Sequence, residues 1–160
     1  MSPRAAWRLE TLGFELAYDY VGGKADWVAN GLHLEGAETP PYAGEFADPD
    51  PPTCALDSSV GAVQAALDRS RHGFCIVVNE QRVVLGRVRR SVVQEADPVA
   101  SAESVMEGGP STVRYDVLAA DLVRRLAERE LQTAIVTTPR GRLVGVFDRA
   151  DAEARLRAAP

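Results

Sequence analysis

The chain has 160 residues, of which 46% are hydrophobic and 26% charged, and its formal net charge is -5 at pH 7. This length favours one compact domain or two small half-domains, and the composition excludes a disordered polymer. The sequence has no continuous apolar stretch of about 18 residues and no pattern of a secretory signal, so we expect a cytoplasmic protein that does not enter a membrane. The negative charge argues against a nucleic-acid partner.

The first 36 residues predict a small α/β fragment. Apolar spacing predicts a helix from Pro3 to Leu12, a short strand from Glu15 to Tyr20, and a second helix from Ala25 to Asn30 that stops at Gly31. So short a fragment buries too little apolar surface to fold alone. Half of the ten prolines lie within residues 37–52, which predicts an extended linker after the fragment.

An internal repeat follows the linker. Residues 53–92 align with residues 112–151 at a constant offset of 59, without a gap, and the apolar positions match. Each copy predicts one strand, one helix and then two strands around a polar turn. The predicted strands are 53–56, 74–78 and 83–88 in the first copy and 112–115, 133–137 and 143–147 in the second. A second helix closes each copy and is clearest at 149–158.

Each copy therefore predicts a βαββα unit with a three-stranded sheet and one helix-covered face. Its core is too small to be stable alone. We expect the two units to pack sheet against sheet about a pseudo-two-fold axis, and the pair to dimerise.

The repeat resembles the CBS-domain pair, also called the Bateman module, over residues 44–157. The segments that carry the resemblance are 104–107, 111–113 and 142–151. It implies an α/β (α+β) fold of tandem CBS repeats, the first over 44–97 and the second over 103–158. It also implies a non-enzymatic regulatory module that forms a homodimer and binds an adenosine-type ligand between the copies. The alternative is a constitutive dimerisation scaffold without a ligand.

The first 36 residues resemble the last part of a rhodanese domain. The resemblance rests on Leu12–Glu15, Tyr18–Lys24, Trp27 and Gly31–Leu32. Rhodanese chemistry needs a thiolate in a loop that precedes this part of the domain, and no cysteine occurs before Cys54. The resemblance therefore implies common descent and no sulfurtransferase activity.

The ligand residues that the CBS resemblance implies lie in the second copy. Gly145 and Asp151 occupy two positions of the motif, and Asp148 stands where a Ser or Thr is expected. Residues expected to line an adenine pocket are Thr112, Val113, Arg114, Thr133 and Ala134. The candidate ligands are AMP, ATP, adenosine and S-adenosylmethionine, and the Asp148 carboxylate favours the last two because it repels phosphate. Alternatively, Asp148 and Asp151 only cap the last helix.

The motif is more degenerate in the first copy, where Arg89 and Val92 replace the Ser/Thr and Asp positions. Arg87, Arg89 and Arg90 form a possible anion-binding cluster. The alternative is that Arg89 neutralises Asp148 and leaves the cleft empty. Phe74 stands where the second copy has Thr133, and its ring is expected to fill one of the two clefts.

The cysteines and histidines do not predict a metal site. The chain has two of each, and their spacing is not that of zinc ligands. Cys54 and Cys75 align with Val113 and Ala134, so we interpret them as small core residues, with redox sensing as the alternative. His72 precedes Gly73 at a predicted helix end, where it would complement the helix dipole.

Overall fold

The computed structural model describes residues 3–18, 21, 23, 27 and 41–158. The chain divides into two compact units, Met1–Thr39 and Pro40–Pro160. No helix among the described residues is long and apolar enough to cross a lipid bilayer.

In the first unit, helix α1 spans Pro3–Thr11 and confirms the predicted helix to within one residue. The strand expected from Glu15 to Tyr20 is wrong for residues 15–18, which form no strand. Leu16 and Tyr18 are 78% and 77% exposed, so their side chains gain nothing from burial on a sheet. Apart from Trp27, the expected helix at 25–30 lies outside the described residues. The rhodanese resemblance stays a prediction.

The second unit contains both copies of the repeat, and paired elements start 59 residues apart, except that β5 starts 60 residues after β1. In the first copy the elements are α3 (Ala43–Phe46), β1 (Ala47–Asp48), β2 (Thr53–Cys54), α4 (Val60–Asp68), β3 (Phe74–Val78), β4 (Val84–Arg89) and α5 (Arg90–Glu95). In the second copy they are α6 (Ala102–Val105), β5 (Glu107–Gly108), β6 (Thr112–Arg114), α7 (Ala119–Glu128), β7 (Thr133–Thr137), β8 (Leu143–Asp148) and α8 (Arg149–Ala158).

The apolar spacing read from the sequence explains the longer helices. The Ser59 side chain caps α4 by accepting a hydrogen bond from the Ala62 N–H. Val60, Val63 and Leu67 of α4 are buried at spacings of three and four, as one face of a helix requires. In α7, Leu122 and Leu126 are buried at the positions equivalent to Val63 and Leu67. Both helices therefore cover their own sheet with the predicted face.

Each sheet has four strands, where the sequence predicted three. The orders are β2-β3-β4-β5 and β1-β8-β7-β6. The fourth strand comes from the chain that precedes the opposite copy: β1 pairs with β8 and β5 pairs with β4, both antiparallel. The prediction of an extended linker over 37–52 is therefore wrong for residues 43–48, which form α3 and β1 and pack on the second copy. There, the Ala43 N–H donates to the Val117 carbonyl at 2.7 Å.

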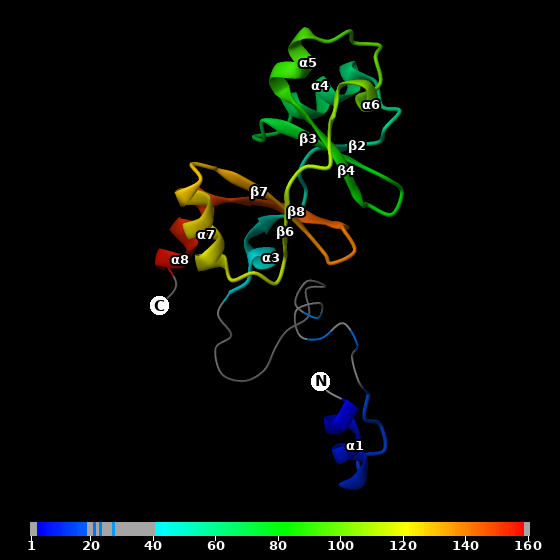
Figure 1. Ribbon diagram of the computed structural model, residues 1–160, viewed down its shortest axis with the longest axis vertical. Coiled ribbons are helices and arrows are strands. Elements are labelled where there is room, and N and C mark those ends of the chain that lie inside the picture. The colour runs from blue at the N-terminus through cyan, green and yellow to red at the C-terminus, as the bar shows by residue number, and fades with distance from the viewer. Residues whose placement is uncertain (1–2, 19–20, 22, 24–26, 28–40, 159–160) are drawn as a thin grey trace. The chain divides into compact units, whose positions relative to one another are not determined.

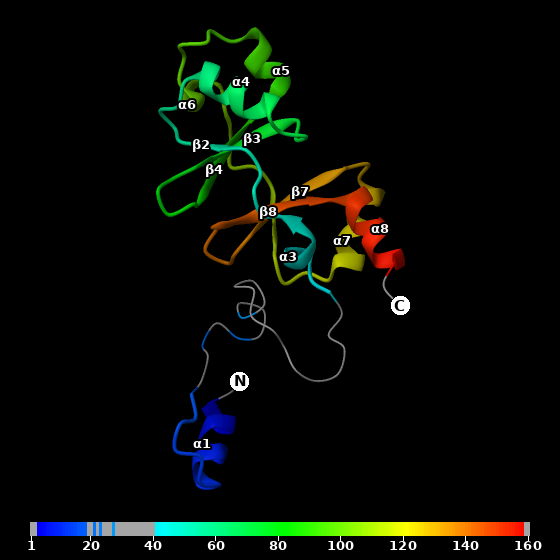
Figure 2. The ribbon, with the colours of Figure 1, turned by 180° about the vertical axis from the view of Figure 1, so that it is seen from behind.

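The two sheets face each other between two groups of helices, α4 to α6 on one side and α3, α7 and α8 on the other (Figures 1 and 2). A cluster of buried residues from both copies, Ile76, Ile135, Leu143 and Val146, joins the sheets, with Phe74, Val78 and Val84 packed against it. The two hairpin turns meet at an isolated bridge between Val83 and Arg142, which are equivalent positions. This arrangement confirms the pseudo-two-fold pair.

Candidate functional site: the groove between the copies

A groove of about 550 Å³ lies between the two copies. One wall is formed by α7, by the strands β6 and β7, and by the chain that leads into β6. The other wall is contributed by the first copy and β5. The lining residues are Phe74, Arg87, Glu107, Gly109, Pro110, Ser111, Thr112, Val113, Leu122, Arg125, Leu126, Arg129, Leu131, Thr133, Ala134 and Ile135.

The groove combines an apolar floor with a polar edge. Leu122, Leu126 and Ile135 are buried beneath it, and Thr112 and Thr133 contribute hydroxyl groups that both donate and accept hydrogen bonds. Among the strands that the structure describes, β6 is the last of its sheet, so its outer edge presents backbone N–H and C=O groups that are not paired with another of these strands. The arrangement suits a flat, partly apolar molecule whose polar atoms meet backbone groups.

Four of the predicted ligand residues line the groove: Thr112, Val113, Thr133 and Ala134. Four do not. The Arg114 guanidinium donates to the Asp116 carboxylate. Gly145 lies under β1, so close that a Cβ at this position would be 2.2 Å from the Asp48 carbonyl oxygen. The absent side chain at Gly145 makes room for a strand of the protein itself, not for a ligand.

Asp148 and Asp151 are engaged at the start of α8. Asp148 Oδ1 accepts the Asp151 N–H at 3.0 Å, which confirms the predicted cap. The Asp151 carboxylate forms an ion pair with Arg71 of the first copy at 2.6 Å. Asp148 is next to the groove in the sheet, because it pairs in register with Thr133, but it does not line the groove.

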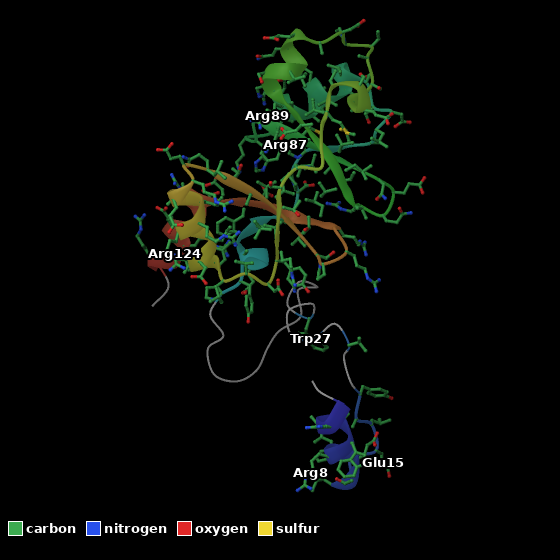
Figure 3. All side chains as sticks on the ribbon, in the orientation of Figure 1. Arg8, Glu15, Trp27, Arg87, Arg89 and Arg124 are labelled. Carbon is green, nitrogen blue, oxygen red and sulfur yellow. The ribbon has the colours of Figure 1, made fainter. Side chains whose placement is uncertain are left out.

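The three arginines of the first copy are not brought together as one cluster. Arg87 and Arg89 both contact the Glu107 carboxylate, Arg87 with two hydrogen bonds of 2.9 Å. Figure 3 shows Arg87 and Arg89 close to each other at the end of β4. Arg90 instead pairs with Asp68 on α4 at 3.0 Å. The alternative that Arg89 neutralises Asp148 is wrong, since the carboxylate that Arg89 contacts is Glu107.

The Arg87 guanidinium, assisted by Arg89, holds the pKa of Glu107 below its ordinary value. Glu107 is therefore ionised at neutral pH, and its charge is compensated by two arginines at the side of the groove.

The region related to the groove by the pseudo-two-fold axis is bridged by ion pairs. Asp48 is the equivalent of Glu107, and its Oδ2 lies 3.0 Å from Nε2 of the buried His72 and 3.6 Å from Arg71. An ionised carboxylate only accepts hydrogen bonds, so Nε2 of His72 carries the proton. The Asp50 backbone N–H and the His72 imidazole lower the pKa of Asp48. His72 therefore contacts β1, the strand of the first copy that pairs with β8 in the sheet of the second, whereas the sequence predicted a role at a helix end.

Sequence reasoning missed Arg125 and Arg129, the two other arginines that line the groove. A signal for them exists in the repeat. Their equivalents in the first copy are Ala66 and Ser70, so the second copy carries two positive charges that the first copy lacks at these positions. The spacing places Leu122, Arg125 and Leu126 on one face of α7, and Arg129 directly follows the end of the helix.

Nothing in the described part of the chain resembles a metal centre: no three His, Cys, Asp or Glu side chains gather as ligands. Cys75 is buried in the core of the first copy, and Cys54 packs against that core. The interpretation as core residues is therefore confirmed for both cysteines.

Comparison with solved structures identifies the architecture. CBSX2 from Arabidopsis thaliana, a CBS-pair protein, was solved in complex with AMP and is 19% identical, with a TM-score of 0.64 over 74% of this chain and 98% of its own. The CBS domain pair of MJ0100, in complex with 5-methylthioadenosine and S-adenosyl-L-methionine, is 16% identical, with a TM-score of 0.59 over 73% of this chain and 95% of its own. The chain has the fold of a CBS-domain pair.

The cytosolic domain of the Mg²⁺ channel MgtE, in complex with ATP, is 20% identical and has a TM-score of 0.64 over 73% of this chain. The chain spans 49% of that domain. No protein-family model matches this chain, and no curated protein sequence matches this chain. At these identities the similarity concerns the fold.

Proposed function

We propose that this chain is a non-enzymatic regulatory module whose CBS pair binds an adenosine-type ligand in the groove between its copies. The groove itself carries the proposal. Its volume of about 550 Å³ lies in the range of small-molecule sites, and four predicted ligand residues from β6 and β7 line it. The three similar structures above were solved with AMP, with ATP, and with 5-methylthioadenosine and S-adenosyl-L-methionine, which share an adenosine moiety.

The groove explains how a ligand would act as a signal. Its walls come from both copies, with Phe74 and Arg87 from the first and α7, β6 and β7 from the second. A ligand that contacts both walls binds one relative arrangement of the copies more tightly than another, and it shifts the equilibrium toward that arrangement by the difference in affinity. In a homodimer formed through the CBS repeats, a change in the arrangement of the two copies in one subunit would alter its contact with the other subunit.

Thermal unfolding of the full chain with AMP, ATP, adenosine and S-adenosylmethionine tests the proposal. A ligand at 100 times its dissociation constant adds about 2.7 kcal/mol to the free energy of unfolding, which raises the melting temperature measurably. Ala134→Leu, which extends a side chain into the groove, should abolish the shift. Ala154→Leu is the matched control, because Ala154 is exposed on α8 and does not line the groove.

Unchanged melting with all four compounds would refute ligand sensing and would support the constitutive scaffold. An equal shift in the Ala134→Leu variant and the wild type would place binding outside this groove.

A further inference from the structure

The charged residues that line the groove are unbalanced. Arg87, Arg125 and Arg129 face a single carboxylate, Glu107. That carboxylate is already taken by Arg87, at 2.9 Å, and by Arg89. Within the part of the chain that the structure describes, no carboxylate lies within 4.0 Å of the Arg125 or Arg129 guanidinium. Two positive charges therefore border the groove without an ion-pair partner there.

Arg125 lies in the last turn of α7 and Arg129 directly follows the helix, and both line the groove. They are four residues apart, and Arg125 shares a face of α7 with the buried Leu122 and Leu126. Like charges at this spacing repel each other on a helix. The C-terminal end of α7 is a favourable place for a positive charge and offsets part of this repulsion. An anion between the two guanidinium groups would remove the repulsion and form charge-assisted hydrogen bonds with both.

The first copy provides an internal comparison. The positions equivalent to Arg125 and Arg129 are Ala66 and Ser70, which carry no charge. The positive charge near the related region is Arg71, and it pairs with Asp151 and Asp48. Among the described residues, the groove therefore carries arginines without an ion-pair partner, whereas Arg71 in the related region is paired.

We infer that the groove selects ligands that carry a phosphate group, and that Arg125 and Arg129 hold the phosphate oxygens. The inference rests on the proposed function and narrows its ligand class to nucleotides. It reverses the sequence-based preference for an uncharged or cationic nucleoside, because Asp148, on which that preference depended, does not line the groove. Planar guanidinium groups suit this role, since they present paired donors to phosphate oxygens.

Isothermal titration calorimetry of the full chain with AMP, adenosine, S-adenosylmethionine and inorganic phosphate tests the inference. We expect AMP to bind about tenfold to hundredfold more tightly than adenosine, as hydrogen bonds to charged groups warrant. S-adenosylmethionine, with its positively charged sulfonium, should bind more weakly than AMP. Inorganic phosphate alone should bind far more weakly than AMP because it leaves the apolar floor uncovered.

The variants Arg125→Gln, Arg129→Gln and the double variant should lose the preference for AMP and keep the affinity for adenosine. Arg124→Gln is the matched control: Arg124 precedes Arg125 on α7 (Figure 3), pairs with Asp121 at 2.9 Å and does not line the groove. The three arginine side chains are exposed, and glutamine has a helix propensity similar to that of arginine, so melting temperatures without ligand should agree.

The outcomes separate the two proposals. If the wild type binds adenosine and AMP equally, or if the double variant keeps the preference for AMP, the inference is overturned while the proposed function stands. If no adenosine compound binds, both are overturned. If inorganic phosphate binds as tightly as AMP, the groove is an anion site and not a nucleotide site, which overturns the inference.

Discussion

The backbone of Asp48 passes directly over Gly145. A Cβ at Gly145 would lie 2.2 Å from the Asp48 carbonyl oxygen and 2.8 Å from its carbonyl carbon. At the equivalent Gly86 a Cβ would lie 2.5 Å from the Met106 sulfur and 3.0 Å from the Glu107 carbonyl oxygen. Each glycine therefore leaves room for the strand that crosses over from the other copy. A Cβ at Gly145 would clash with backbone atoms, whereas the nearest atom to a Cβ at Gly86 belongs to a side chain.

We expect Gly145→Ala to destabilise the fold by about 3 kcal/mol, because relief of the contact requires β1 to move away from β8. Gly86→Ala should cost about 1 kcal/mol, since the nearest atom belongs to the flexible Met106 side chain. Gly108→Ala is the control, because nothing lies within 4 Å of its Cβ position. Urea unfolding gives all three values. Equal losses at Gly145 and Gly108 would show that β1 does not need this close approach.

His72 and Arg71 should contribute very differently to stability, although both contact Asp48. The His72 side chain is 5% exposed and the Arg71 side chain 58%. His72→Ala removes packing against Phe74 and leaves Asp48 without its buried partner, so we expect a loss of about 2 to 3 kcal/mol. Arg71→Ala should cost less than about 1 kcal/mol, as for other exposed ion pairs. Similar unfolding midpoints for the two variants would contradict this ranking.

The free energy of unfolding should decrease at acidic pH, and part of this decrease should come from protonation of Asp48. The Asp50 backbone N–H and His72 lower the pKa of Asp48 in the folded chain from its ordinary value of 3.8. A carboxyl group whose pKa is lower in the folded chain stabilises the fold above its unfolded pKa, and this contribution disappears as the pH falls through the folded pKa.

The difference in unfolding free energy between the wild type and Asp48→Asn should therefore be constant near neutral pH and shrink below about pH 4. Urea titrations at a series of pH values measure it. A difference that grows on acidification would mean that the neutral carboxyl, not the carboxylate, is the form that the fold favours.

The two cysteines should react with thiol reagents at unequal rates. Cys75 is fully buried, and its hydrogen bond with Cys54, together with burial, raises the pKa of the Cys75 thiol. Cys54 is half-buried, and the same hydrogen bond lowers its pKa. Because the thiolate is the reactive form, we expect the native protein to lose one thiol to an aromatic disulfide reagent and the second only in denaturant. Cys54→Ser should remove the native reaction, whereas Cys75→Ala should preserve it.

The sequence predicted most of the fold because the two copies carry matching apolar positions. The helices at Val60–Asp68 and Ala119–Glu128 and the hairpins that follow them were predicted from spacing alone. The crossed strands β1 and β5 were not predicted, since each is two residues long and carries no periodicity. The repeat does continue there, because Asp48 and Glu107 stand at equivalent positions.

The ligand site was predicted only in part: four of the eight expected ligand residues line the groove. Thr112, Val113, Thr133 and Ala134 were expected from the resemblance to CBS-domain pairs, and all four line the groove. Which side chains face them across the groove depends on how the copies pack, and the sequence does not contain that information locally. Asp151 was assigned to a ligand because its pairing with Arg71 of the first copy depends on that packing. Arg125 and Arg129 lie on the same wall as the four residues, and they were missed although the uncharged Ala66 and Ser70 at the equivalent positions are a signal for them.

Glu107 should act as an internal competitor of a phosphate ligand. Its carboxylate lines the groove and occupies both Arg87 and Arg89. Glu107→Gln removes the one negative charge among the lining residues and frees the two guanidinium groups, so we expect AMP to bind several-fold more tightly and adenosine to bind as before. Glu103→Gln, an exposed position on α6 outside the groove, is the matched control. Calorimetric titration with AMP and adenosine measures both affinities. Weaker AMP binding in the Glu107→Gln variant would show instead that this carboxylate accepts hydrogen bonds from the ligand, and that phosphate is held elsewhere.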